Sequence, residues 1–211
     1  MLNITSQLLK DVIYQLSKLP GLGYRSSLRL AVYILNNNDS DVDNLIKAIT
    51  KLKNDIHICE ICGNIADETI CNICKSNKRD AHVICMVEDI LGIIAIENTN
   101  EYFGLYHVLN GVIAPVDGVG PDKLNIQSLY NRINPEVKEI IFALNSTPEG
   151  DTTSFYISKK ILEINPNIKI SVLSQGISPD SEIEYTNSVT LAKSIENRIE
   201  YKNTKFSTYG R

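Results

Sequence analysis

The sequence has no apolar run that approaches the roughly 18 residues needed to cross a bilayer, and its first five residues lack the basic segment that opens a secretory signal. We therefore expect neither a membrane protein nor a secreted one. It also has no internal repeat and no low-complexity tract, which excludes fibrous and repeat architectures. Apolar residues make up 43% and charged residues 22% of the 211 positions, close to average soluble usage, so a disordered chain is excluded as well. A chain of this length buries a hydrophobic core in one or two domains.

Cysteine is scarce. The chain has five cysteines, an odd number that is too small for a disulfide scaffold. Four of them form two CxxC pairs separated by eight residues, Cys59/Cys62 and Cys71/Cys74. Two CxxC turns that face each other supply the four-sulfur tetrahedron that Zn²⁺ prefers. The pattern therefore predicts one structural Zn²⁺ per chain, in a reducing cytoplasm. A chance cluster and a redox pair are the alternatives, although a redox CxxC normally opens a helix after a strand.

Excess positive charge is missing too. The net charge is −4, and residues 81–211 account for it with 11 basic and 16 acidic side chains, against 10 and 9 in residues 1–80. The overall basic character of many nucleic-acid-binding proteins is therefore absent. Residues 10–29 nevertheless hold four basic side chains and one acidic one, so any nucleic-acid contact is expected at that end of the chain.

Helical spacing of apolar residues predicts a small all-helical module in the first 54 residues. Its helices are expected over residues 2–17, about 28–35 and about 42–52. The first two are separated by Leu19-Pro20-Gly21-Leu22-Gly23, where one proline and two glycines break the pattern.

This break resembles the turn of a DNA-binding hairpin. Glycines allow positive φ and a close approach of another backbone, and free N–H groups at the start of the next helix favour a phosphate. Arg25 and Arg29 lie four residues apart, on one helix face just beyond the turn. We therefore expect a helix-hairpin-helix that binds the sugar-phosphate backbone of DNA without sequence preference, through Gly21, Gly23, Arg25 and Arg29. The alternative is an ordinary connection between two helices.

After residue 80, short apolar runs alternate with stretches of helix length. Strands are expected at 83–87, 106–109, 140–144 and 170–173, and helices at 89–98, 126–133 and 152–164. This alternation predicts βαβ units and a mainly parallel sheet that is buried on both faces. Cys85 lies inside the first strand run and is expected to be a buried apolar residue rather than a metal ligand.

Three carboxylates follow the expected strands. Glu88 ends the first strand run, and Glu149 and Asp151 come shortly after the run at 140–144. Carboxyl ends of parallel strands meet at one edge of the sheet, where ligands usually bind, and three acids there could hold Mg²⁺. In the alternative reading, these loop carboxylates are solvated and Asp151 caps the following helix.

The order of these modules resembles the RecR family of bacterial recombination mediators, over nearly the whole chain. The likeness rests on the hairpin residues above, on YFGLYHVLN at residues 102–110, on DGVGP at 117–121, and on Glu184-Tyr185 with Val189-Thr190-Leu191-Ala192. Two positions depart from the family: Arg25 stands where lysine is usual, and Asp180-Ser181-Glu182 where the family usually has Gly-Gly-Asp.

The resemblance implies a multi-module α+β and α/β chain. Its parts are a helix-hairpin-helix module at 1–54, a four-cysteine zinc finger at 55–80, a Toprim-like α/β domain with a mainly parallel sheet at 81–198, and a tail at 199–211. It also implies a non-enzymatic factor in recombinational DNA repair that assembles into dimers or tetrameric rings. Such a factor works with RecO and RecF to load the RecA recombinase at single-strand gaps.

Two other functions stay open. A Toprim-type nuclease or primase-like enzyme would use Glu88, Glu149 and Asp151 with Mg²⁺, and a zinc protein with a small-ligand site would leave the hairpin without a role. No Ser–His, Cys–His or Lys-based nucleophile accompanies the acids, and the surrounding half of the chain is negative. We therefore expect the acids to form a surface for a basic protein partner, RecO by resemblance, with weak Mg²⁺ binding and no catalysis.

Overall fold

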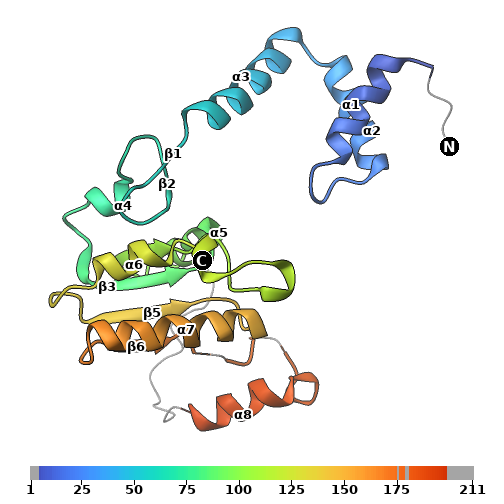
Figure 1. Cartoon of the computed structure of the whole chain (residues 1–211). Coiled ribbons are helices and arrows are strands. Elements are labelled where there is room, and N and C mark those ends of the chain that lie inside the picture. Colours follow the sequence, from blue (N-terminus) through green and yellow to red (C-terminus); the bar gives the residue numbers. More distant parts are fainter. Residues whose placement is uncertain (1–4, 175, 179–180, 199–211) are drawn as a thin grey trace. The chain divides into compact units, whose positions relative to one another are not determined.

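The computed structural model describes residues 5–174, 176–178 and 181–198, in two compact units (Figure 1). One unit comprises residues 1–57 with 66–68, and the other comprises 58–65 with 69–211. The expected tail at 199–211 and Asp180 lie outside the described residues, as do the first residues of the first expected helix. None of the described helices is long and apolar enough to cross a membrane.

The first unit contains the three expected helices. They are α1 (Gln7–Ser17), α2 (Tyr24–Asn36) and α3 (Asp39–Asp55). α1 begins where the Ser6 hydroxyl accepts a hydrogen bond from the Leu9 N–H at 3.3 Å, which satisfies one free donor of the first turn. α1 and α2 pack against each other as a hairpin, and Ile13, Ser27 and Ala31 become buried.

α3 differs from the other two helices because none of its residues is buried. Its apolar residues do recur at helical spacing, as the sequence predicts. They stay exposed within the described chain, however, and they are Leu45, Ile46, Ile49 and Leu52.

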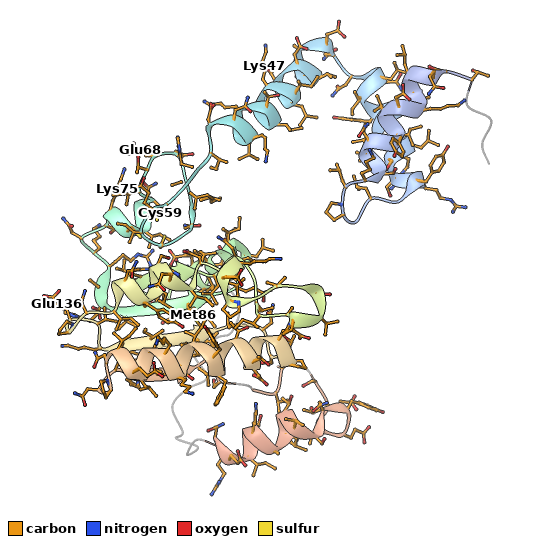
Figure 2. The ribbon with its side chains drawn as sticks, in the orientation of Figure 1. Lys47, Cys59, Glu68, Lys75, Met86 and Glu136 are labelled. Atoms are coloured by element: carbon orange, nitrogen blue, oxygen red, sulfur yellow. The ribbon has the colours of Figure 1, made fainter. Side chains whose placement is uncertain are left out.

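A parallel sheet of four strands forms the centre of the second unit, in the order β4-β3-β5-β6 (Figure 1). The strands are β3 (Asp80–Val87), β4 (Gly104–Val108), β5 (Glu139–Ala143) and β6 (Lys169–Val172). Met86 of β3 is fully buried at the middle of the sheet, paired with His107 on one side and Phe142 on the other (Figure 2).

Helices cover both faces of this sheet. They are α5 (Ile90–Glu97), α6 (Ile126–Arg132) and α7 (Pro148–Ile164). The second unit also contains α8 (Ser188–Glu196) and the 3-10 turns η1 (Pro115–Asp117), η2 (Pro121–Lys123) and η3 (Ile183–Tyr185). Successive side chains of β3 point to opposite faces. Ile84 and Met86 pack with α6 and α7, whereas Cys85 and Val87 pack with α5. The predicted fold class is confirmed, and so is the burial of Cys85.

Two helices begin four residues earlier than predicted. α2 begins at Tyr24 rather than at about residue 28, and α7 begins at Pro148 rather than at residue 152. The Thr147 hydroxyl accepts a hydrogen bond from the Gly150 N–H at 3.1 Å, so Thr147 caps the helix and Asp151 does not. Gly150 is required in this first turn, because a Cβ there would clash with the backbone oxygen of Asn145.

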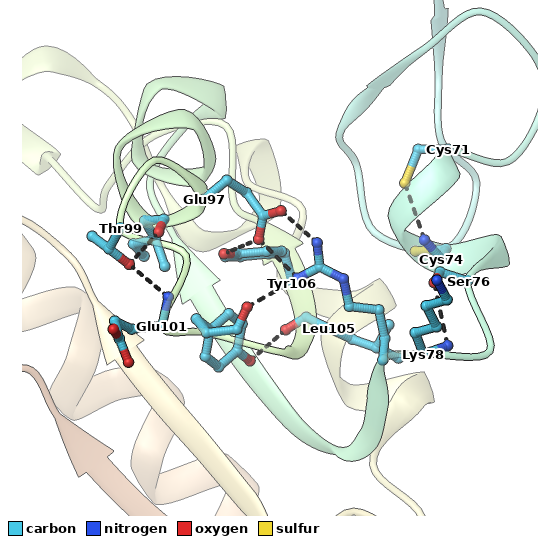
Figure 3. Close-up of polar contacts among 12 residues, drawn as sticks. Cys71, Cys74, Ser76, Lys78, Glu97, Thr99, Glu101, Leu105 and Tyr106 are labelled. Atoms are coloured by element: carbon cyan, nitrogen blue, oxygen red, sulfur yellow. Dashed lines mark hydrogen bonds and ion pairs between the residues drawn. The ribbon is translucent and has the colours of Figure 1, made fainter. Parts of the chain in front are cut away.

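A partly buried ion pair fixes the entry of β3 against α5 (Figure 3). Arg79 Nη1 donates to Glu97 Oε1 at 2.8 Å, and Nη2 pairs with the other carboxylate oxygen. The Tyr106 hydroxyl donates to the same Oε1 at 2.7 Å, and Arg79 also donates to the Tyr102 carbonyl at 3.2 Å. Hydrogen bonding from Arg79 lowers the pKa of Glu97.

Replacing Glu97 with glutamine should lower the free energy of unfolding by about 1–3 kcal/mol at neutral pH, because a hydrogen-bonded charge is lost. The folded-state pKa of Glu97 lies below its unfolded value. Its stabilising contribution is therefore present above the unfolded pKa and is lost as the pH falls through the folded pKa. Denaturant titrations of wild type and variant should converge in acid.

Glu163→Gln is the matched control. Glu163 is exposed, and among the described residues its ion-pair partner is the exposed Lys160 in the same helix, so its removal should leave the denaturation midpoint unchanged. Equal stability of Glu97→Gln and wild type at neutral pH would show that the Arg79–Glu97 pair has no structural role.

Candidate functional site

The first cysteine pair lies on a tight turn between two short strands (Figure 2). These strands are β1 (His57–Ile58) and β2 (Ile65–Ala66). The Cys59 N–H donates to the Asn64 carbonyl at 2.7 Å, and the Gly63 N–H donates to the Cys59 carbonyl at 2.9 Å. Gly63 has a φ of +76°, which a residue with a Cβ adopts only under strain. The turn therefore holds Cys59 and Cys62 on one side.

The second pair lies at the start of the short helix α4 (Asn72–Lys75). Cys71 is its N-cap, and its Sγ accepts a hydrogen bond from the Cys74 N–H at 3.5 Å (Figure 3). The two turns bring all four Sγ atoms within 4.8 Å of one another, and the Cys62 and Cys71 sulfurs lie 3.6 Å apart. We call residues 56–76 the knuckle.

The donor set fits Zn²⁺. Four Zn–S bonds of about 2.3 Å in a tetrahedron place the sulfur atoms about 3.8 Å apart, close to the spacing of the knuckle cysteines. Hydrogen bonding from Cys74 lowers the pKa of Cys62 to about 5, whereas the same contact raises the pKa of Cys74. Burial raises the pKa of Cys71. Zn²⁺ binds the thiolate form of cysteine, so metal binding releases protons from these side chains.

The knuckle is bonded to the edge of the sheet. The Val108 N–H of β4 donates to the Cys62 carbonyl at 2.7 Å, and the Asn125 side chain donates to the Val108 carbonyl at 2.9 Å. A Cβ on Gly63 would lie 2.7 Å from that Asn125 nitrogen and 3.0 Å from the Val108 carbonyl oxygen, so the turn and the sheet approach closely at this residue. The knuckle therefore covers an edge strand, a contact that sequence spacing does not reveal.

The hairpin residues lie between α1 and α2. Gly21 has a φ of +81°, as expected for the turn. Gly23 is extended and is the N-cap of α2, and a Cβ on it would meet nothing within 4 Å, so the expectation of a special conformation holds for Gly21 alone. Arg25 and Arg29 are exposed on α2, and neither forms an ion pair with a described residue.

The three Toprim-like acids do not gather into one site. Among residues 5–174, 176–178 and 181–198, the four cysteines are the one group of three or more metal-ligating side chains close enough to hold an ion. Glu88 accepts a hydrogen bond from the Asn145 side chain at 2.8 Å. Glu149 and Asp151 lie exposed in the first turn of α7. The three carboxylates are therefore not within ligand distance of one common ion.

A shallow cavity of about 510 Å³ lies beside this edge of the sheet, within the second unit. Asp151 and Asn145 line it together with Lys193 of α8, whereas Glu88 and Glu149 do not. That Lys193 and α8 are neighbours of Asp151 could not be predicted from the sequence, because no local pattern links residues so far apart in the chain.

Thr153 is a further residue that sequence reasoning missed. Its side chain is fully buried in α7, where its hydroxyl donates to the Glu149 carbonyl and accepts a hydrogen bond from the Ile113 N–H at 2.8 Å. This contact holds the glycine-rich loop after β4 against the start of α7. A threonine within a helix gives no sequence signal of such a role.

Four family models match the chain in sequence order. They are the RecR helix-hairpin-helix over residues 9–53, the RecR zinc finger domain with four cysteine ligands over 56–76, the Toprim domain over 82–174 and the RecR C-terminal region over 180–199.

Curated proteins named "Recombination protein RecR" are similar over nearly their full length. The protein from Cytophaga hutchinsonii is 47% identical over 199 residues, 93% of this chain and 96% of its own. The protein from Amoebophilus asiaticus is 46% identical over 93% of this chain and 98% of its own. That from Lactobacillus acidophilus is 48% identical over 86% and 91%. The family model of a four-cysteine zinc finger matches the knuckle, and the four sulfur atoms lie close enough to bind one ion. Together these two findings confirm the prediction of a structural zinc ion.

Replacing Cys71 with serine should release the zinc and loosen residues 57–76, because metal binding supplies the folding free energy of the knuckle. Elemental analysis of protein purified without chelators should find close to one zinc per chain in wild type and far less in the variant.

Cys85→Ser is the control, because Cys85 lies in the sheet core away from the cluster. It should keep its zinc. Wild-type protein without zinc, or loss of zinc from Cys85→Ser alone, would show that the knuckle is not the metal site.

Proposed function

Because the chain belongs to the RecR family of recombination proteins, we propose that it is a DNA-binding, non-enzymatic mediator of recombinational DNA repair. In this role it acts in the cytoplasm with RecO and RecF to load RecA at single-strand gaps. The single observation that most favours DNA binding is the exposed pair of arginines, without a described ion-pair partner, beside the glycine turn of the hairpin. The zinc knuckle is structural in this proposal and takes no part in chemistry.

The hairpin has exposed positive charges that can contact DNA phosphates. Arg25 and Arg29 are one turn apart on α2, and Lys10 and Lys18 lie on α1 and at its end. Contacts to phosphate oxygens fix the position of a protein on DNA but read no sequence, so we infer sequence-independent binding.

A second step of the proposal is self-assembly into a dimer or a tetrameric ring. A chain with net charge −4 binds DNA weakly by itself, because affinity depends on the number of phosphates neutralised. Several copies would add the charges of their hairpins on one DNA strand. The uncovered apolar residues of α3, Leu45, Ile46, Ile49 and Leu52, supply a surface that association would bury.

The acids at the carboxyl edge of the sheet are proposed to bind a basic protein partner, RecO. Glu88, Glu149 and Asp151 lie in the half of the chain with five more acidic than basic side chains, which repels DNA and attracts a basic surface. Weak Mg²⁺ binding there is compatible with this role. The lack of a preformed cluster of the three carboxylates argues against a Mg²⁺-dependent nuclease.

Arg25→Gln and Arg29→Gln should each weaken DNA binding to a similar degree for all sequences. Each lost phosphate contact should flatten the plot of log affinity against log salt by about 0.7–0.9. Fluorescence anisotropy with single-stranded and duplex probes at several salt concentrations measures both effects.

Arg198→Gln is the charge-matched control, since Arg198 is exposed just after α8 in the other unit. It should bind DNA as wild type does. If the double variant Arg25→Gln/Arg29→Gln keeps its zinc and fold and still binds DNA normally, the hairpin has only a structural role or forms an oligomer contact.

Reversing the charges of Glu149 and Asp151 to lysine should abolish the complex with purified RecO while zinc content and DNA affinity stay near wild type. Each lysine should lower the free energy of unfolding by about 1 kcal/mol, because positive charge at the N-terminus of α7 opposes the helix macrodipole. Titration calorimetry with RecO measures the loss.

Glu163→Lys reverses a charge near the other end of the same helix and should leave the RecO complex intact. Metal-dependent cleavage or primer synthesis by wild type, lost in Glu88→Ala, would overturn the mediator assignment and favour a Toprim enzyme.

A further inference from the structure

One aromatic side chain continues the row of cations on α2. Arg25, Arg29 and Tyr33 follow one another at intervals of four residues, and residues at this spacing share one face of a helix. All three residues are exposed, and Tyr33 is 65% exposed. The row extends over about 12 Å, because a helix rises by about 1.5 Å per residue.

This row faces away from the contact between α1 and α2. The buried residues of α2 are Ser27 and Ala31, and the helix packs against α1 (Figure 1). Ser27 follows Arg25 by two residues, which places it about 200° around the helix and so on the opposite side. The packing of the hairpin therefore leaves the Tyr33 ring uncovered.

The Tyr33 side chain has no partner in the described part of the chain. Its ring pairs with no other ring or cation, and its hydroxyl forms no hydrogen bond there. The exposed Tyr14 of α1 differs, because the Lys18 ammonium lies 4.2 Å from the centre of its ring. A single exposed tyrosine is ordinary on a protein surface. What points to a ligand is the position of this one, in line with two arginines that lack described ion-pair partners.

Two cations and an aromatic ring in one row suit the chemistry of a single nucleic-acid strand. Each nucleotide of such a strand offers a phosphate and a base with an exposed flat face, and an aromatic side chain stacks on any of the bases. In a duplex the bases are paired and stacked, and extracting one costs free energy. α2 contains no acidic residue, so this helix adds no repulsion against phosphates.

We propose that Tyr33 stacks on a base of single-stranded DNA and thereby gives the hairpin a preference for single strands over duplex. The inference rests on the proposed DNA-binding function, in which Arg25 and Arg29 contact phosphates. The arginines bind the backbone of either form of DNA, and Tyr33 adds affinity only where an unpaired base is within reach. The row selects no sequence, because every base has a flat face.

Fluorescence anisotropy of the full-length zinc protein with three labelled probes of equal length tests this role. The probes are oligo(dT), a duplex, and a single strand that keeps its phosphates but has no bases. Tyr33→Ala should lower the affinity for oligo(dT) at least about fivefold, the lower end of the contribution of one aromatic–base stack. Its affinity for the other two probes should stay at the wild-type value. Tyr33→Phe keeps the ring and should bind all three probes as wild type does.

The dependence of binding on salt separates Tyr33 from the arginines. Loss of Tyr33 removes no phosphate contact, so the plot of log affinity against log salt should keep its slope in Tyr33→Ala, whereas the arginine variants flatten it. Tyr156→Ala is the matched control, because Tyr156 is a 46% exposed tyrosine on α7, in the other unit. It should bind all three probes as wild type does.

A tryptophan at the same position gives a second readout that does not depend on affinity. The chain has no tryptophan, so Tyr33→Trp introduces a single indole fluorophore. A base that stacks on the indole should quench its emission when oligo(dT) saturates the protein, and a saturating duplex should not. The emission of Tyr156→Trp should stay constant with either probe.

Equal affinity of Tyr33→Ala and wild type for oligo(dT) would overturn the stacking role, as would unchanged emission of Tyr33→Trp bound to oligo(dT). An equal loss of affinity for all three probes would also overturn it and would assign Tyr33 to the fold or to a contact between copies of the chain. If wild type binds none of the probes, the proposed DNA-binding function fails, and the role of Tyr33 fails with it.

Discussion

The sulfur atoms of Cys59, Cys62, Cys71 and Cys74 lie within 4.8 Å of one another, a spacing that four thiolates tolerate only around a cation. Apolar packing within the knuckle is slight: apart from three of these cysteines, its one buried apolar side chain is Ala66, and Ile73 is partly buried against the sheet. Metal binding therefore takes the place of a hydrophobic core. The edge of the sheet depends on the folded knuckle, because the outer side of β4 bonds to the Cys62 carbonyl and not to another described strand.

This dependence extends into the second unit. The Asn125 side chain donates to the Val108 carbonyl of β4, and His107 of the same strand bonds to the Asn125 carbonyl. Arg132 at the end of α6 donates to the Tyr106 carbonyl of β4. The Arg79–Glu97 pair fastens the segment that leaves the knuckle to α5. Most of the zinc finger, residues 58–65 and 69–76, thus belongs to the same compact unit as the parallel sheet.

Much of this organisation could be predicted from the sequence. The CxxC spacing specified the metal, and alternation of apolar runs specified the parallel sheet, because both signals are local. The start of α7 was missed because the Thr147 cap and the close approach of Gly150 to Asn145 depend on a turn that composition does not encode. Arg132, His107 and Asn125 were missed because their roles arise from contacts between distant residues. The gathering of three acids was expected from topology, but strand ends specify an edge and not the side-chain distances within it.

The central claim is that bound zinc holds the knuckle against β4, and exchange of the Val108 amide hydrogen tests it most directly. This amide should be strongly protected in the zinc-bound protein and should exchange much faster once a chelator removes the metal, since its acceptor is the Cys62 carbonyl. The amides between β3 and β5 at the centre of the sheet should keep most of their protection. Equal protection of Val108 with and without zinc would contradict the account, because the contact would then form independently of the metal.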